Sequence, residues 1–228
     1  MNIYILDPQF RRIGICDEYK SFIWTPRYFE YGDFELYAPA NSRLIGLLVR
    51  NNLICREDDP THAMFIERVE VVTDAENGNT IRATGRCLKS LLSRRVIWKQ
   101  TITTGTIAFC ISKLLSENII NPADTNRKVE GLSIGTMEGS TGQMSAQYTG
   151  DNLGEVIIGI CRNYGLGFDI VIENGGLVFK VYQGKDRSFN QSQNPFVVFS
   201  PEYENLISTT YIEDAQIYAN IARIGGEG

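Results

Sequence analysis

The sequence predicts a β-dominated α+β fold, and three observations lead to this class. Apolar residues alternate with polar ones between turn-forming dipeptides in the first part of the chain, they then recur at the helical spacing of about 3.6, and a further strand pair follows. Because 228 residues exceed the common domain size of about 100 to 150, more than one domain is expected. We predict a barrel-like β domain at residues 1–98, an α+β domain at 99–199 and the truncated beginning of a second β-barrel at 200–228.

The first domain is expected to consist of short strands. They are predicted at residues 2–6, 12–16, 21–24, 33–39, 51–56, 64–73 and 80–85, with one helical turn within residues 44–50. The last two strands flank Asn77-Gly78, a dipeptide that favours tight hairpin turns. Within residues 64–73 apolar side chains alternate with charged ones, so we expect one face of this strand to be buried.

Three helical segments are predicted further along the chain. They cover residues 87–95, 104–118 and about 153–164. Asp151 or Asn152 can cap the third helix, and Gly165 can end it in the left-handed conformation. A second hairpin follows, in which strands at residues 167–172 and 177–182 flank the turn 173–176.

The last part of the chain is predicted to form strands at residues 196–199, 206–211 and 215–224. The final strand would have no partner, and an unpaired strand edge is a template for pairing with another chain. We therefore expect the chain to be a fragment of a longer protein, or to need a neighbour to complete its sheet.

An aromatic run at residues 22–37 is the most distinctive segment. It contains seven aromatic residues in sixteen positions, interleaved with Pro26, Gly32 and acidic residues. Rings with one polar edge are enriched where proteins contact each other. An aromatic corner of a β core remains an equally compatible interpretation. If the run forms a contact surface, the residues expected to make the contacts are Trp24, Tyr28, Tyr31, Phe34 and Tyr37.

Composition and charge exclude several classes of function. The formal net charge is −5 and no segment forms a basic stripe, which disfavours direct binding of nucleic acid. A mildly acidic wall would instead let DNA slide past without adhering. The longest apolar runs are far shorter than the roughly 20 residues of a membrane span, and the N-terminus does not read as a secretory signal. Membrane insertion is therefore not expected.

No cofactor, metal or catalytic group is expected. The five cysteines are widely spaced, so free buried thiols are predicted. His62 is the single histidine and lies beside Asp58 and Asp59. A zinc site needs at least three ligands, and a calcium loop needs a different acidic spacing. We predict that His62 is exposed or flanks a hairpin, that residues 57–59 form a solvated acidic turn, and that the chain is not an enzyme.

Four segments in a fixed order resemble a family of siphovirus tail proteins. They are ILDPQFRRIGICDEYKSFIWTPRYFEYGDFELYAPA at residues 5–40, TGRCLKSLLSRRVI at 84–97, VYQGKDRS at 181–188 and FSPEYENLISTTYIEDAQIYANIARIGGEG at 199–228. The chain looks like the structural N-terminal part of the baseplate hub, also called the tail-associated lysin. Positions that match the family pattern and define its fold or assembly are Trp24, Tyr28, Gly32, Phe34, Glu35, Gly85, Arg86, Leu92, Arg95, Gly184, Asp186, Arg187, Asn205, Tyr218 and Asn220.

The resemblance implies a role in the virion, at the tail tip, after synthesis in the cytoplasm of a bacterial host. It implies a homotrimer in which two similar barrel-like domains per copy form a ring of near sixfold symmetry. That ring would dock on the distal tail protein ring, and the tape-measure protein and then DNA would pass through it without specific binding. Family members usually continue through the second barrel and often into a wall-degrading module.

A carbohydrate-binding module that recognises host cell-wall glycan is the alternative function. Exposed aromatic rings can stack on sugars, and a largely β architecture suits either role. Oligomeric state discriminates the two, because a ring component must associate with copies of itself whereas a sugar-binding module works as a monomer.

Overall fold

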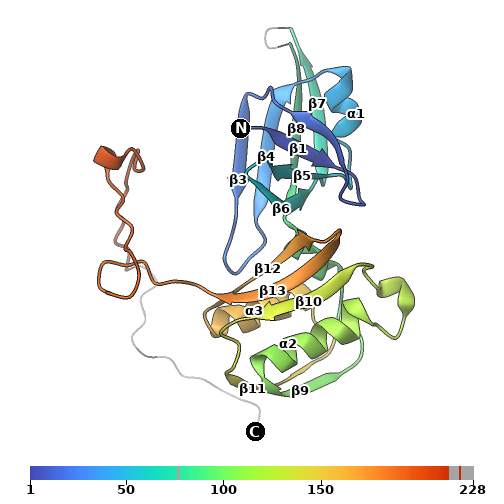
Figure 1. Ribbon diagram of the computed structural model, residues 1–228, viewed down its shortest axis with the longest axis vertical. Coiled ribbons are helices and arrows are strands. Elements are labelled where there is room, and N and C mark those ends of the chain that lie inside the picture. Colours follow the sequence, from blue (N-terminus) through green and yellow to red (C-terminus); the bar gives the residue numbers. More distant parts are fainter. Residues whose placement is uncertain (76–77, 216–220, 222–228) are drawn as a thin grey trace. The chain divides into compact units, whose positions relative to one another are not determined.

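The structure of the chain is a computed structural model that describes residues 1–75, 78–215 and 221, and it divides into two units at residues 1–184 and 185–228. Every strand and α-helix of the described residues lies in the first unit (Figure 1). Strands predominate over helices, which confirms the predicted β-dominated α+β class.

Two antiparallel four-stranded sheets build the first part of this unit. One has the order β2-β1-β5-β6 and consists of β1 (Ile3–Leu6), β2 (Arg12–Cys16), β5 (Leu53–Arg56) and β6 (Asp59–Phe65). The other has the order β3-β4-β8-β7 and consists of β3 (Ser21–Thr25), β4 (Asp33–Pro39), β7 (Arg68–Asp74) and β8 (Gly78–Arg86). The helix α1 (Ser42–Leu47) begins at its N-cap Asn41.

The two sheets share a core rather than closing into a barrel. Ile3 and Ile5 of the first sheet and Leu36 and Ile81 of the second belong to one buried cluster, and all four are fully buried. Closure into a barrel requires hydrogen bonding between the first and last strands, which sequence alternation does not specify. Among the described residues none of the sheets closes, so the predicted barrel shape is wrong for this part of the chain.

The strand predicted at residues 64–73 is split between two sheets. Met64 lies near the end of β6, which stops at Phe65, whereas β7 begins at Arg68. Val71 and Val72 point to opposite faces of β7, and both are nearly half exposed. Since β7 is an end strand, the expected buried face of this segment is wrong. The tip of the predicted hairpin at 76–77 lies outside the described residues.

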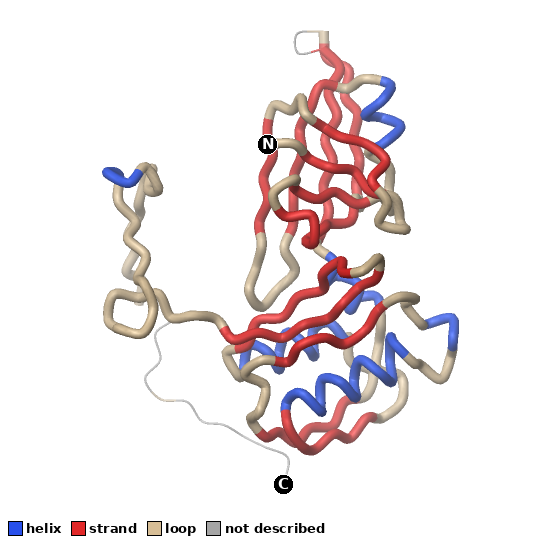
Figure 2. The backbone as a smooth tube through the Cα atoms, in the orientation of Figure 1, coloured by secondary structure: helices blue, strands red, loops and turns tan. Residues whose placement is uncertain are grey.

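Helices and shorter sheets form the rest of the first unit. After a 3₁₀ segment (Leu88–Arg94) come β9 (Thr101–Thr106), α2 (Ile107–Leu115), a π-helical turn (Ser116–Ile120) and a 3₁₀ turn (Thr125–Arg127). They are followed by β10 (Leu132–Met137), β11 (Gln143–Tyr148), α3 (Leu153–Asn163), β12 (Leu166–Glu173) and β13 (Gly176–Gln183). The sheets are β10-β13-β12 and β11-β9, and a buried core lies between the three-stranded sheet and both helices (Figure 2).

Local signals placed the third helix correctly. The Asn152 side chain accepts hydrogen bonds from the backbone N–H of Gly154 and Glu155, so it is the N-cap. Gly165 follows the helix with φ +66°, as predicted. The second helix begins later than predicted because residues 101–106 pair with β11, and Thr106 then caps α2. All five cysteines are free and buried, which confirms that prediction.

The second unit does not contain the predicted strands at residues 196–199 and 206–211. Its described residues form one 3₁₀ turn (Pro201–Tyr203) and no strand. A strand needs a hydrogen-bonding partner, and no described segment pairs with this one. The strand predicted at 215–224 falls almost entirely outside the described residues, and the assignment of 200–228 to a second barrel stays a prediction.

Candidate functional site

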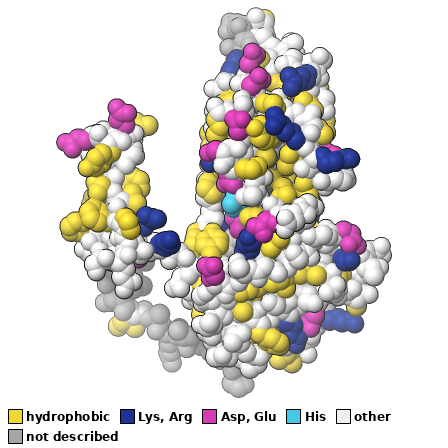
Figure 3. Space-filling view, viewed as in Figure 1, with side chains coloured by type: hydrophobic (Ala, Val, Ile, Leu, Met, Phe, Trp, Pro, Cys, Tyr) yellow, Lys and Arg dark blue, Asp and Glu magenta, His cyan; other side chains and the backbone are white. Residues whose placement is uncertain are grey.

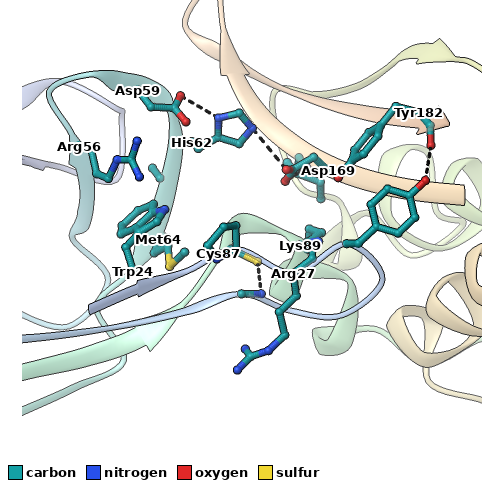
Figure 4. Close-up of a pocket in the computed structure, with 15 residues that line it drawn as sticks. Trp24, Arg27, Arg56, Asp59, His62, Met64, Cys87, Lys89, Asp169 and Tyr182 are labelled. Carbon is teal, nitrogen blue, oxygen red and sulfur yellow. Dashed lines mark hydrogen bonds and ion pairs between the residues drawn. The ribbon is translucent and has the colours of Figure 1, made fainter. Parts of the chain in front are cut away.

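A cleft of about 520 Å³ in the first unit is lined by residues of β6 and β12, among others. The loop that follows β3 supplies Tyr28 to its lining, and β6 supplies Asp59 and His62. Lys89 comes from the 3₁₀ segment and Asp169 from β12 (Figure 4). Alternation in β12 explains the last position, because Phe168 and Ile170 turn into the helical core and Asp169 therefore faces the opposite side.

His62 lies between two carboxylates. Its Nδ1 is 2.8 Å from Oδ1 of Asp59, and its Nε2 is 3.3 Å from Oδ2 of Asp169 (Figure 4). The hydrogen bond with Asp169, helped by the one with Asp59, overcomes burial and raises the pKa of His62 to about 9. Burial alone would raise the pKa of Asp59, but its bonds with His62 lower it. The imidazole is therefore protonated at neutral pH and cannot serve as a general base.

Lys89 and Cys87 lie deeper in the same cleft. The Lys89 side chain is 2% exposed, its Nζ donates to the backbone carbonyl of Arg27 at 2.6 Å, and Nζ lies 4.9 Å from the centre of the Phe168 ring. Burial lowers the pKa of Lys89, although nearby Asp169 opposes this. Burial also raises the pKa of Cys87, whose Sγ accepts a hydrogen bond from the N–H of Gly32. A protonated thiol is a poor nucleophile.

The charged groups of the cleft are held by ion pairs and hydrogen bonds, some of them with residues outside its lining, and in the part of the chain that the structure describes they do not form a metal site. Arg56 pairs with Asp58 at 2.8 Å, and Arg27 pairs with Asp33. Within the described residues, no three His, Cys, Asp or Glu side chains are arranged to hold a metal ion. The arrangement fastens β6 to β12 through charge and hydrogen bonds. The predicted solvated turn at residues 57–59 is thus only partly right, because Asp59 is half-buried and paired.

The aromatic run does not form one continuous surface. Trp24 and Tyr28 line the cleft, whereas Phe34 is 2% exposed and stacks on Trp24 with 6.4 Å between ring centres. Tyr31 packs against both buried clusters. The Lys20 ammonium lies over the Tyr37 ring, with Nζ 5.4 Å from the ring centre. The contact role of these five residues stays a prediction, and in this structure Phe34 can contribute only by supporting Trp24.

Tyr28 connects the aromatic run to the second half of the unit. Its hydroxyl donates to the carbonyl of Gly165 at 3.1 Å and accepts from the N–H of Gly184 at 2.6 Å. Its ring meets that of Tyr182 edge-on at 5.4 Å. Through these contacts Tyr28 holds the β3–β4 loop against the end of β13.

Sequence reasoning missed Asp169, Lys89 and the protonated state of His62. The signal for Asp169 was available, because it is the one charged residue within residues 166–172, an otherwise apolar strand. A carboxylate in a buried strand requires a partner. The identity of that partner was not available, since it depends on how two distant strands pack.

Comparison with known proteins identifies relatives of the chain. A family model described as Siphovirus ReqiPepy6 Gp37-like protein matches residues 2–228. The crystal structure of prophage tail protein gp18 from Listeria monocytogenes EGD-e matches with a TM-score of 0.52 and 15% identity over 79% of this chain and 50% of that chain. The tail protein from Neisseria meningitidis MC58 gives a TM-score of 0.52 and 12% identity over 78% and 49%.

The TM-scores show that the chain shares its fold with these two structures, and the chain spans about half the length of the two tail proteins. A search of curated proteins found no match.

Proposed function

We propose that this chain, which belongs to the Siphovirus ReqiPepy6 Gp37-like protein family, is a structural component of a phage tail. The observation that carries the proposal is the family match over residues 2–228, and the fold shared with two tail proteins supports it. The family match also confirms the resemblance to siphovirus tail proteins that the sequence suggested. A cleft whose ionised side chains are held by ion pairs and hydrogen bonds supports a mechanical rather than a chemical role.

The finer proposal is a hub adaptor at the tail tip that assembles as a homotrimeric ring and docks on the distal tail protein ring. Tape-measure protein and then DNA would pass through the ring. The net charge of −5 supports passage without adhesion. The face of the first unit seen in Figure 3 carries both acidic and basic side chains, with the basic ones of its upper part mainly on the right and the acidic ones mainly on the left. No helix in the described part of the chain has the length and hydropathy needed to cross a membrane.

Two end strands of one sheet supply a route to self-association. β3 and β7 are the opposite edges of the sheet β3-β4-β8-β7, and each carries exposed aliphatic side chains, Ile23 at 53% and Val71 at 48%. Pairing of β3 in one copy with β7 in the next would be a head-to-tail contact. Such contacts close into rings when the rotation per copy permits.

Labelling of the virion tests the structural role. An antibody against this chain should mark one end of the tail in electron micrographs of purified particles, and the chain should be present in their protein composition. An antibody against a capsid protein serves as the control. Particles that lack the chain altogether would refute the structural role.

Light scattering tests the ring. The chain mixed with its distal tail protein should give a complex that contains three copies of the 25.7 kDa subunit. Val71→Lys should abolish the trimer by placing a charge in the β3–β7 contact, whereas Ile45→Lys, a similarly exposed site on α1, should not. A monomer that binds cell-wall polysaccharide through residues 22–37 would favour the carbohydrate-binding alternative instead.

A further inference from the structure

A second cavity, of about 380 Å³, lies at the end of α2 and away from the aromatic run. Trp98 lines it and is 64% exposed, which is unusual for the largest apolar side chain. The π-helical turn Ser116–Ile120 contributes Glu117 and Asn118 to the lining of the same cavity. Single π-helical turns within α-helices occur frequently at functional sites.

The tryptophan ring is held in place before any ligand arrives. The guanidinium of Arg127 lies 4.4 Å from the Trp98 ring centre, and the same guanidinium donates to the backbone carbonyl of Val96. Arg95 fixes the backbone of this segment by donating through Nε to the carbonyl of Arg127 at 2.6 Å. Arg127 therefore covers one part of the Trp98 ring. The rest of the Trp98 ring is exposed and offers a flat surface to a ligand.

Polar groups with spare hydrogen-bonding capacity surround this flat surface. Asn118 is 4% exposed, and its amide is oriented because Nδ2 donates to the carbonyl of Leu114 at 2.9 Å. Asp124 uses Oδ1 to accept from the N–H of Asn126 at 3.0 Å, which leaves its second oxygen available. Within the described residues the Asn121 side chain makes no hydrogen bond. Amides and carboxylates of this kind can donate to and accept from hydroxyl groups.

The charges around the cavity balance. Lys99 and Arg127 carry positive charge, and Glu117 and Asp124 carry negative charge. Phosphate groups and anionic polymers bind at sites with an excess of basic side chains. A neutral ligand therefore fits this cavity better than an anionic one. The cavity volume is near the lower end of the roughly 300 to 1,000 Å³ that small-molecule sites occupy, which suits one or two sugar rings.

We propose that this cavity binds a neutral oligosaccharide. A pyranose ring has an apolar C–H face that can lie on Trp98 and a rim of hydroxyl groups that can bond to Asn118, Asn121 and Asp124. The site is independent of residues 22–37, and the inference does not rest on the proposed tail role. Virion labelling and sugar binding can therefore fail separately.

Tryptophan fluorescence tests the proposal, because the chain has two tryptophans, Trp24 and Trp98. In Trp24→Phe, all tryptophan emission comes from Trp98. Titration with chitotriose, cellotriose, maltotriose and mannotriose should give a saturable change with at least one of them. Calorimetry with that sugar should show binding weakened at least about tenfold in Trp98→Ala, and about two- to tenfold in Asn121→Ala through loss of one hydrogen bond.

Phe109→Ala is the matched control, since Phe109 is a 53% exposed aromatic residue outside the cavity, and its binding should equal that of the parent. Circular dichroism and thermal unfolding verify that each variant is folded. No saturable response to any of the four sugars at about 10 mM would overturn the proposal. So would unchanged affinity in Trp98→Ala, or saturable binding only of an anionic saccharide or an arginine-rich peptide.

Discussion

His62 carries the only imidazole of the chain, and its two ring nitrogens face carboxylates from different strands. Asp59 belongs to β6 and Asp169 to β12, so the protonated ring joins the first four-stranded sheet to the sheet that covers the helices. Lys89 adds a second positive charge beside Asp169. The two carboxylates and the two cations neutralise one another at the junction.

The pH dependence of stability should report this junction. The folded-state pKa of His62 is raised from 6.5 to about 9, so its stabilising contribution is complete below pH 6.5 and is lost as the pH rises through 9. The side chain is 42% exposed, and after discounting for solvent screening we expect a loss of about 1 kcal/mol in the free energy of unfolding. Urea unfolding between pH 6 and about 9.5 measures it.

Two variants isolate the histidine from other titrating groups. His62→Gln should remove this decline, and Asp169→Asn should lower the pKa of His62 because Asp169 is the main cause of its shift. Proton NMR follows the pKa directly, because a single histidine gives only one pair of titrating ring C–H signals. A wild-type value near 6.5 would show that the carboxylates do not hold the ring as described.

At the residue scale, the sequence predicted the chemical state of single side chains better than it predicted which residues they contact. Free buried cysteines followed from their wide spacing, and they were confirmed. The orientation of Phe34 depended on the register of β4, in which Phe34, Leu36 and Ala38 share the buried face. The pairing of His62 with Asp169 depended on tertiary packing between strands that are far apart in the chain, which no local pattern encodes.

At the scale of elements, the close approach of another backbone segment to β8 limits which residue can stand at one of its positions. Gly85 lies opposite Phe34 in the ladder between β4 and β8. A Cβ atom on Gly85 would lie 1.7 Å from the carbonyl oxygen of Phe65 and 2.9 Å from the carbonyl carbon. The end of β6 and the residue pair after it therefore pass β8 at a position that tolerates no side chain, next to the bridge between Met64 and Cys87.

Gly85→Ala should accordingly destabilise the first unit by about 2–4 kcal/mol, because backbone rather than a flexible side chain would have to move. Urea unfolding followed by circular dichroism measures the change. Gly159→Ala is the matched control, since Gly159 lies within α3 with no atom within 4 Å of an added Cβ. It should stabilise the protein by about 0.5–1 kcal/mol. Equal midpoints for the two variants would refute the close approach.

Element types were predicted more reliably than element ends. The cap at Asn152, the stop at Gly165 and the hairpin of β12 and β13 depend on residues next to each other in the chain, and local chemistry encodes them. The start of α2 depends on the pairing of β9 with β11, whose residues are distant in sequence. Barrel closure and the strands predicted at residues 196–199 and 206–211 fail for the same reason, because each requires a partner strand.

At the scale of the whole molecule, the two units differ in how they bury apolar side chains. The first contains both hydrophobic clusters. In the second, large apolar residues such as Ile207, Tyr211 and Ile212 are 79% to 102% exposed. Apolar area exposed to this extent is a feature of surfaces that bind other proteins.

The first unit should therefore fold without the second. A chain of residues 1–184 retains both buried clusters and every described strand and α-helix, so its free energy of unfolding should lie within about 0.5 kcal/mol of that of the full chain. Far-ultraviolet circular dichroism and urea unfolding provide the comparison. The shortened chain should also aggregate less at high concentration, because it lacks the exposed apolar residues of the second unit. A shortened chain that is unfolded, or markedly less stable, would mean that residues 185–228 supply part of the core.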